Sequence, residues 1–235
     1  MPRIPVGPQA RLRAIDQAMG VAFRPVQGVC DEGPAPNSLA SIELQVQQAF
    51  PFRPSLAAAT QPVFGEGNPN ADVVFIGEAP GADEDRTGRP FVGAAGQKLD
   101  QIISAMGLAR EDVYICNILK ARPPRNRAPL ADEIAVNSPF LIDQLRCIRP
   151  SVIVALGGPA AKFLLDTDLG ITRLRGRWGT WSSPAGDCQC AVMPTFHPAY
   201  LLRQYTPEVR GQMWQDMQQV MERLSGQLGQ GPKKT

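Results

Sequence analysis

The sequence has one histidine, five cysteines and few aromatic residues (6%) among 235 residues. No apolar run reaches the roughly 18 residues of a membrane-spanning helix, so no membrane segment is expected. An odd cysteine count, with Cys116 and Cys147 inside apolar or helical runs, argues against a secreted disulfide framework. A formal net charge of +2 is too small to indicate nucleic-acid binding by itself. The missing membrane segment and the odd number of cysteines favour a soluble protein of the reducing cytoplasm.

The composition, with 43% hydrophobic residues, suits one globular domain with a substantial core. Prolines crowd the first 40 positions, which predicts an irregular N-terminal arm over residues 1–37. We expect a folded domain over residues 38–226 and a polar tail over residues 227–235. No repeat of fixed period is visible.

Val- and Ile-rich runs alternate with segments of helical spacing along the domain. The expected strands are 72–77, 113–119, 152–157 and 190–195, and the expected helices are 38–50, 99–106, 131–148, 160–165 and 207–224. Continuously apolar strands between helices predict an α/β fold, in which a parallel sheet is covered on both faces. Ligands of such sheets bind beyond the carboxyl ends of the strands. The loops after those ends are therefore the candidate site.

The loop after the first strand combines carboxylates with a glycine-rich stretch. It begins Gly77-Glu78-Ala79-Pro80-Gly81, continues through acidic residues to Asp85, and carries Phe91 among glycines. The acidic part is either a solvated turn or a set of carboxylates near converging backbone amides. Phe91 is either a stacking platform or a plug over the core.

The second strand contains an amide and is followed by a basic loop. Asn117 stands in an apolar run, where a carboxamide needs hydrogen-bond partners. Four cations then follow within eight positions, namely Lys120, Arg122, Arg125 and Arg127. The prolines hold this loop extended, so its basic side chains could pair with successive phosphates of a nucleic acid. The alternative is that the charged side chains form a solvent-exposed face without a ligand, which is the more common case for a run of charges.

The single histidine, His197, directly follows the last strand and precedes a proline-fixed turn. Leu201 and Arg203 come next, an apolar side chain beside a phosphate-binding charge. A lone histidine is more often structural than catalytic, but this placement favours a functional role.

Five segments in order carry a resemblance to a known family. They are Gly77-Glu78-Ala79-Pro80-Gly81, Gly88-Arg89-Pro90-Phe91-Val92-Gly93, residues 120–129, Val154-Ala155-Leu156-Gly157 and His197-Pro198-Ala199-Tyr200-Leu201-Leu202-Arg203. The chain closely resembles the uracil-DNA glycosylase superfamily, and within it the family 4 (thermophile-type) enzymes. The resemblance implies a three-layer αβα sandwich around a four-stranded parallel sheet, and monomeric excision of uracil from single- or double-stranded DNA by base flipping.

The resemblance also implies roles for the loop residues. The implied uracil pocket consists of Gly77, Glu78, Ala79, Phe91, Asn117 and His197. His197 would donate to uracil O2, and Asn117 would distinguish uracil from cytosine. Glu78 or Asp85 would handle the water or the sugar cation, since Ala79 stands where the best-known relatives have aspartate. In contact with the DNA, Leu201 would fill the gap left by the flipped base. The DNA phosphates would be bound by Lys120, Arg122, Arg125, Arg127 and Arg203.

One departure from family 4 is large. Those enzymes hold a four-iron four-sulfur cluster on four cysteines, and the corresponding positions here are Pro51, Pro54, Ala121 and Asn137. None of these side chains supplies a thiolate, so we expect no cluster, metal or other cofactor.

A second departure from the family pattern concerns how the pocket would reject thymine. Gly81 replaces the aromatic of the best-known enzymes, which leaves that task to a side chain within residues 83–85.

The sequence also leaves two rival functions open. One is a non-catalytic relative that binds uracil-containing or abasic DNA. A protein that binds only the phosphates of DNA would need none of Asn117, Phe91 and His197. The other is a small α/β enzyme acting on nucleotides, but the glycine-rich phosphate-binding motifs of such enzymes are absent.

Overall fold

The computed structural model describes residues 38–228. The predicted N-terminal arm over residues 1–37 and most of the predicted tail lie outside the described residues. No helix within residues 38–228 is long and apolar enough to cross a membrane.

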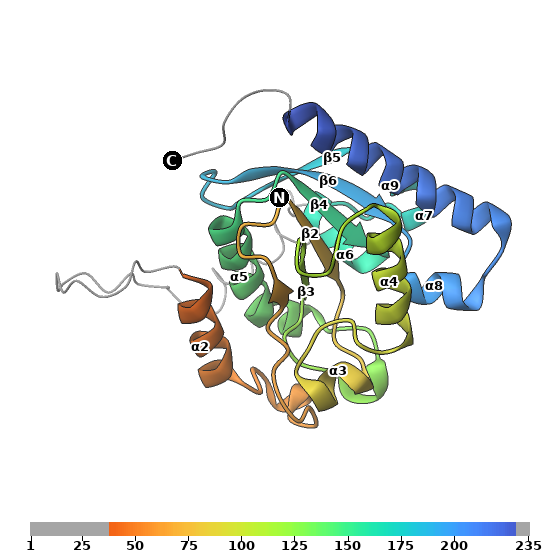
Figure 1. Ribbon diagram of the computed structural model, residues 1–235. Helices are drawn as coiled ribbons and strands as arrows, with labels where there is room; N and C mark the ends of the chain where they lie inside the picture. Colours follow the sequence, from red (N-terminus) through yellow and green to blue (C-terminus); the bar gives the residue numbers. More distant parts are fainter. Residues whose placement is uncertain (1–37, 229–235) are drawn as a thin grey trace, which may run out of the picture.

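The centre of the fold is a six-stranded sheet with the strand order β1-β3-β2-β4-β6-β5 (Figure 1). Its strands are β1 (Glu66–Gly67), β2 (Val73–Gly77), β3 (Tyr114–Asn117), β4 (Val152–Leu156), β5 (Gly179–Ser182) and β6 (Gln189–Thr195). The four inner strands run parallel, as expected. The expectation of four strands missed the two edges, β1 and β5, which pair antiparallel with their neighbours.

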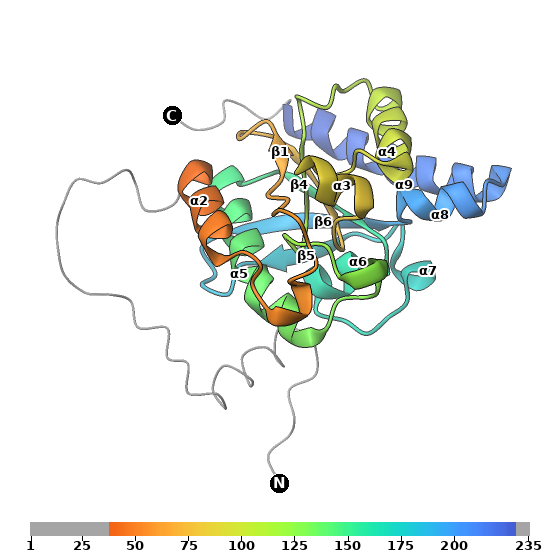
Figure 2. The same cartoon turned by 90° about the horizontal axis from the view of Figure 1, so that it is seen from below.

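Helices cover both faces of the sheet, which confirms the predicted αβα sandwich (Figure 2). The longer helices are α2 (Leu39–Ala49), α4 (Ala94–Ala105), α5 (Ala131–Ile148), α6 (Gly158–Leu165) and α9 (Pro207–Leu228). The shorter ones are α3 (Ala82–Thr87), α7 (Ile171–Leu174), α8 (Pro198–Arg203) and the 3₁₀ turns η1 (Pro54–Leu56) and η2 (Pro124–Asn126).

The two faces of β2 show how the layers are held together. Val74 and Ile76 pack into the apolar cluster that contains α5 and α6. Val73 and Phe75 point the other way, into the cluster that contains α4 and α9. Because all five β2 residues are buried, the strand reads as a continuous apolar run.

Polar and aromatic contacts surround the positions that correspond to the family 4 cluster cysteines. Asn137 lies in α5, where its Oδ1 accepts a hydrogen bond from the Lys120 backbone N–H at 2.9 Å. The Ser55 hydroxyl of η1 donates to Glu133 Oε1 at 2.5 Å. The Phe52 ring packs against Phe140 with centroids 5.9 Å apart. The Ser55 and Phe52 contacts join the segment after α2 to α5, and the Lys120–Asn137 hydrogen bond joins the loop after β3 to the same helix.

Candidate active site

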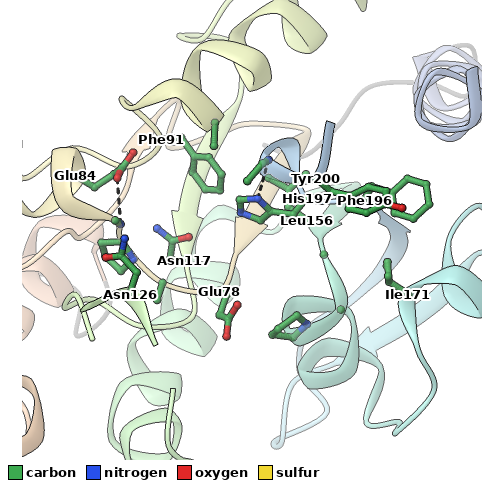
Figure 3. Close-up of a pocket in the computed structure, with 18 of the residues that line it drawn as sticks. Glu78, Glu84, Phe91, Asn117, Asn126, Leu156, Ile171, Phe196, His197 and Tyr200 are labelled. Carbon is green, nitrogen blue, oxygen red and sulfur yellow. Dashed lines mark hydrogen bonds between the residues drawn. The ribbon is translucent and has the colours of Figure 1, made fainter. Parts of the chain in front are cut away.

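A pocket of about 640 Å³ opens at the carboxyl edge of the parallel strands, where the sequence predicted a site (Figure 3). Its wall combines the loops that follow β2, β3, β4 and β6. The lining includes Glu78, Ala79, Glu84, Phe91, Asn117, Arg127, His197, Tyr200 and Arg203. The fold therefore brings together residues that are far apart in the sequence.

His197 follows β6 and caps the N-terminus of α8. Its Nδ1 accepts a hydrogen bond from the Ala199 backbone N–H at 3.1 Å, so the proton of the neutral ring resides on Nε2. Burial, reinforced by the charge of Arg203, lowers the pKa of His197 to about 4. At neutral pH the pocket thus holds an uncharged imidazole with one N–H left to donate.

Phe91 stacks on His197, with ring centroids 5.6 Å apart and planes inclined by 29° (Figure 3). Phe91 has a left-handed backbone with φ of 52°, so its loop requires external support. Glu84 supplies that support, because its Oε1 accepts the Val92 and Gly93 N–H groups at 2.9 Å each. Its Oε2 accepts the Gly81 N–H at 3.1 Å.

Glu84 was absent from the predicted site. The available signal was its spacing, since a glutamate three residues after the N-cap position of a helix is typical of a capping box. In α3 it fills that place after Gly81, and it also reaches across to the Phe91 loop. Glu84 thus joins the two halves of the first loop.

Asn117 ends β3 and is almost fully buried. Within the described part of the chain, its Oδ1 is one of four buried side-chain nitrogen or oxygen atoms without a hydrogen-bond partner. Gly77 makes this arrangement possible, because a Cβ there would come within 2.5 Å of Phe91 Cζ and would collide with Asn117 Oδ1. The pocket therefore presents an acceptor with an unused hydrogen-bonding capacity.

The two predicted catalytic carboxylates are in different places. Glu78 lines the pocket, and partial burial raises its pKa. Asp85 does not line it, which corrects the prediction. The Asp85 Oδ1 accepts the Thr60 backbone N–H at 2.8 Å. Successive side chains of a helix point about 100° apart, so in α3 Glu84 reaches the pocket while Asp85 holds the segment around Thr60.

Lys120 is a second correction, because its side chain is fully buried and does not reach a phosphate. Its Nζ donates to the Asn117 carbonyl oxygen at 2.8 Å and to Gln144 Oε1 at 2.5 Å. Burial lowers the pKa of Lys120 to about 8. Lys120 instead supports the backbone of Asn117 from within the protein.

The four arginines predicted to bind phosphates lie in the loop after β3 and at the end of α8. Arg127 and Arg203 line its wall. Arg127 is held by Glu133, with Nη2 and Oε1 2.6 Å apart. Arg125 is exposed in the same loop, and Arg122 donates through Nε to Asn126 Oδ1 at 2.7 Å. The basic loop thus forms one side of the pocket.

Leu201 is a third correction. It is only 4% exposed and packs with Phe196 and Met213, so it is not an apolar wedge on the surface. The next residue of α8, Leu202, is 47% exposed. The helical turn of about 100° per residue places the first leucine inward and the second outward.

Comparison with known proteins agrees with this geometry. A family model described as the uracil DNA glycosylase superfamily matches residues 64–218. The type-4 uracil-DNA glycosylase of Thermotoga maritima is 46% identical over 162 residues, which cover 68% of this chain and 82% of that protein. The type-4 enzyme of Saccharolobus solfataricus is 43% identical over 166 residues, covering 68% and 75%.

A type-5 uracil-DNA glycosylase of Pyrobaculum aerophilum is 35% identical over 156 residues, covering 60% of this chain and 67% of that protein. The residues of the family match include Glu78, Phe91, Asn117 and His197, which form the pocket described above. The chain belongs to the uracil-DNA glycosylase superfamily.

Proposed function

We propose that this protein is a type-4-like uracil-DNA glycosylase that hydrolyses the N-glycosidic bond of deoxyuridine and leaves an abasic site. The observation that carries the proposal is the unpartnered Asn117 Oδ1, buried in the same pocket as the neutral His197. The N3–H donor and the O2 and O4 acceptors of uracil match these two side chains.

Asn117 provides selectivity for the base. Its Oδ1 accepts the N3 proton of uracil while its Nδ2 donates to O4. Cytosine presents an acceptor at N3 and an amino donor at C4, so both hydrogen bonds are lost. A buried polar group left unpaired costs about 1–3 kcal/mol, which disfavours cytosine in the pocket.

His197 stabilises the leaving group. Bond breaking leaves negative charge on uracil and positive charge on the sugar. The Nε2–H of His197 donates to uracil O2, where the negative charge develops, and the hydrogen bond from Ala199 fixes the ring before the reaction begins. Phe91 presents an apolar surface against the base.

Glu78 is the carboxylate that acts on the sugar side of the N-glycosidic bond. It faces the pocket beside Ala79, whose methyl group cannot orient water. The Glu78 carboxylate holds the attacking water and stabilises the cationic sugar. Water is thus the nucleophile, and the pocket residues carry the chemistry without a cofactor.

A duplex hides the glycosidic bond, so the uridine must leave the base stack at a cost of a few kcal/mol. Phosphate contacts from Arg122, Arg125, Arg127 and Arg203 offset that cost. We propose that the substrate is uracil-containing DNA, single- or double-stranded, and that the enzyme acts as a monomer in the cytoplasm.

Excision is tested with labelled single-stranded and duplex oligonucleotides that carry one uracil, followed by alkaline cleavage of abasic sites. We expect cleavage by the wild-type protein, none on the cytosine-containing control, and a large loss in His197→Ala. Binding to uracil-containing DNA without cleavage would contradict the proposal and favour a non-catalytic relative. Iron and sulfide analysis of the purified protein tests the absence of a cluster, and stoichiometric iron would refute it.

A further inference from the structure

A second groove, of about 480 Å³, also borders α8 but is lined by a different residue of that helix than the active pocket. The helices α4, α8 and α9 form it together with the segment that joins α8 to α9 (Figure 1). The side chains that matter are Lys98, Leu201, Tyr205, Arg210 and Trp214. None of them has a role in the chemistry proposed above.

The groove combines exposed aromatic rings with cations. Tyr205 is 57% exposed, and its ring centroid lies 4.9 Å from Lys98 Nζ and 5.0 Å from Arg210 Cζ. The two cations thus hold the ring in place. Trp214 is 36% exposed in the same groove. No carboxylate of the described residues lines it. This combination suits a polyanion that also carries flat rings, which describes a nucleic-acid strand.

The helix α8 connects the groove to the active pocket. Tyr200 and Arg203 line the pocket, and Leu201 lines the groove. Tyr205 follows two residues after the end of the helix. A DNA strand that leaves the pocket along the exposed side of α8 therefore arrives at Tyr205.

We propose that this groove binds the uracil-bearing DNA strand within a few nucleotides of the flipped uridine. A base packs against Tyr205 or Trp214, and the adjoining phosphates pair with Lys98 and Arg210. The inference rests on the proposed function, because that function supplies the strand. The cations disfavour a neutral protein surface, and the exposed rings favour a nucleic-acid strand over an acidic protein surface, whose carboxylates offer no stacking partner.

The test measures excision kinetics on single-stranded oligonucleotides with uracil at the centre, or truncated on its 5′ or its 3′ side. The variants are Tyr205→Ala and Arg210→Gln. Their matched controls are Leu44→Ala, an exposed apolar residue of α2, and Arg149→Gln, an exposed cation that ends α5 just before β4 begins. All four side chains are exposed, so the fold is expected to persist, and thermal melting checks it.

We expect each groove variant to raise the KM of the full-length substrate about 5-fold or more, with kcat little changed. Truncation on one side of the uracil should raise the wild-type KM similarly and abolish the difference between wild type and Tyr205→Ala. A KM within twofold of wild type on all substrates, or an unchanged difference after both truncations, would overturn the proposal.

Absence of excision by the wild-type protein would contradict the proposed function alone. The groove is then decided by fluorescence anisotropy with the same oligonucleotides. Weaker binding by Tyr205→Ala than by Leu44→Ala supports the groove, and equal affinities overturn it.

Discussion

Phe91 and His197 stack with their ring centroids 5.6 Å apart, although each is held by a different part of the chain. Glu84 fixes the Phe91 loop through backbone amides, and the Ala199 N–H fixes the imidazole. Neither ring orientation depends on a charged interaction between the rings. The pair is therefore in place before a substrate enters, as electrostatic preorganisation requires.

Replacing His197 with alanine removes the donor to uracil O2. We expect kcat to fall by about 10²–10³, as for the loss of one donor to a developing oxyanion, while the Kd for DNA stays close to the wild-type value. Single-turnover excision measures the first quantity, and anisotropy measures the second. A variant as fast as wild type would exclude this role.

The low pKa of His197 also predicts a pH dependence of stability. The unfolded chain binds a proton at this residue below a pKa of about 6.5, whereas the folded protein does so only below about 4. The contribution of His197 to the free energy of unfolding therefore decreases as the pH falls from about 6.5 to about 4, and is constant above that window. Urea unfolding at several pH values should show a shallower decrease for His197→Asn than for wild type.

The raised pKa of Glu78 predicts that the excision rate decreases at acidic pH. Partial burial raises its pKa above the usual value, and the ionised form is the one proposed to hold water and stabilise the sugar cation. The excision rate should thus fall on acidification at a pH above the ordinary glutamate range. In Glu78→Gln the rate should be lower and that decrease absent, whereas an unchanged decrease would assign it to another group.

Glu84→Ala tests the support of the Phe91 loop. Loss of three backbone hydrogen bonds allows the loop to shift, and a displacement of about 1 Å at a reacting group costs about 10²-fold in rate. The matched control is Asp83→Ala in the same helix, where the exposed carboxylate pairs with Arg86. We expect kcat/KM to fall strongly only in Glu84→Ala, and partial recovery in Glu84→Gln, which retains an acceptor.

The sequence was informative where a residue type is unusual for its position. Asn117 in an apolar strand, Phe91 among glycines and His197 after a strand each indicated the site, because burial of an amide or a histidine needs a reason. The carboxyl edge of the sheet was located differently, from the alternation of strands and helices and the rule that ligands bind beyond the carboxyl ends of parallel strands. What these residues share is that their chemistry conflicts with their immediate surroundings.

Side-chain direction could not be read in the same way. Lysine is almost never fully buried, so Lys120 was expected on the surface. Its burial depends on Gln144, an acceptor far along the chain, and on the Asn117 carbonyl. Asp85 and Leu201 were misplaced because one residue along a helix turns the side chain by about 100°, which is enough to direct it into the protein interior. The β1 edge is two residues long and leaves no periodic signal.

Asn117 variants test base selection. Asn117→Ala removes both the acceptor for N3–H and the donor to O4, so kcat/KM for uracil should fall and the ratio of uracil to cytosine excision should decrease. Asn117→Asp changes the donor into an acceptor and should weaken the same discrimination. A competition assay with cytosine-containing DNA measures the ratio. Unchanged discrimination in both variants would contradict the assignment.

Gly77→Ala tests the close approach of Asn117 and Phe91. The added methyl group would lie within 2.5 Å of the Phe91 ring, so either the ring or the Asn117 side chain must move. We expect a loss of excision at least as large as in Asn117→Ala, together with a lower melting temperature. Gly226→Ala in α9 is the control, because no atom lies within 4 Å of a Cβ there and alanine favours a helix by about 1 kcal/mol over glycine. Full activity in Gly77→Ala would show that Asn117 and Phe91 have room to separate without loss of function, and would remove the need for their tight contact.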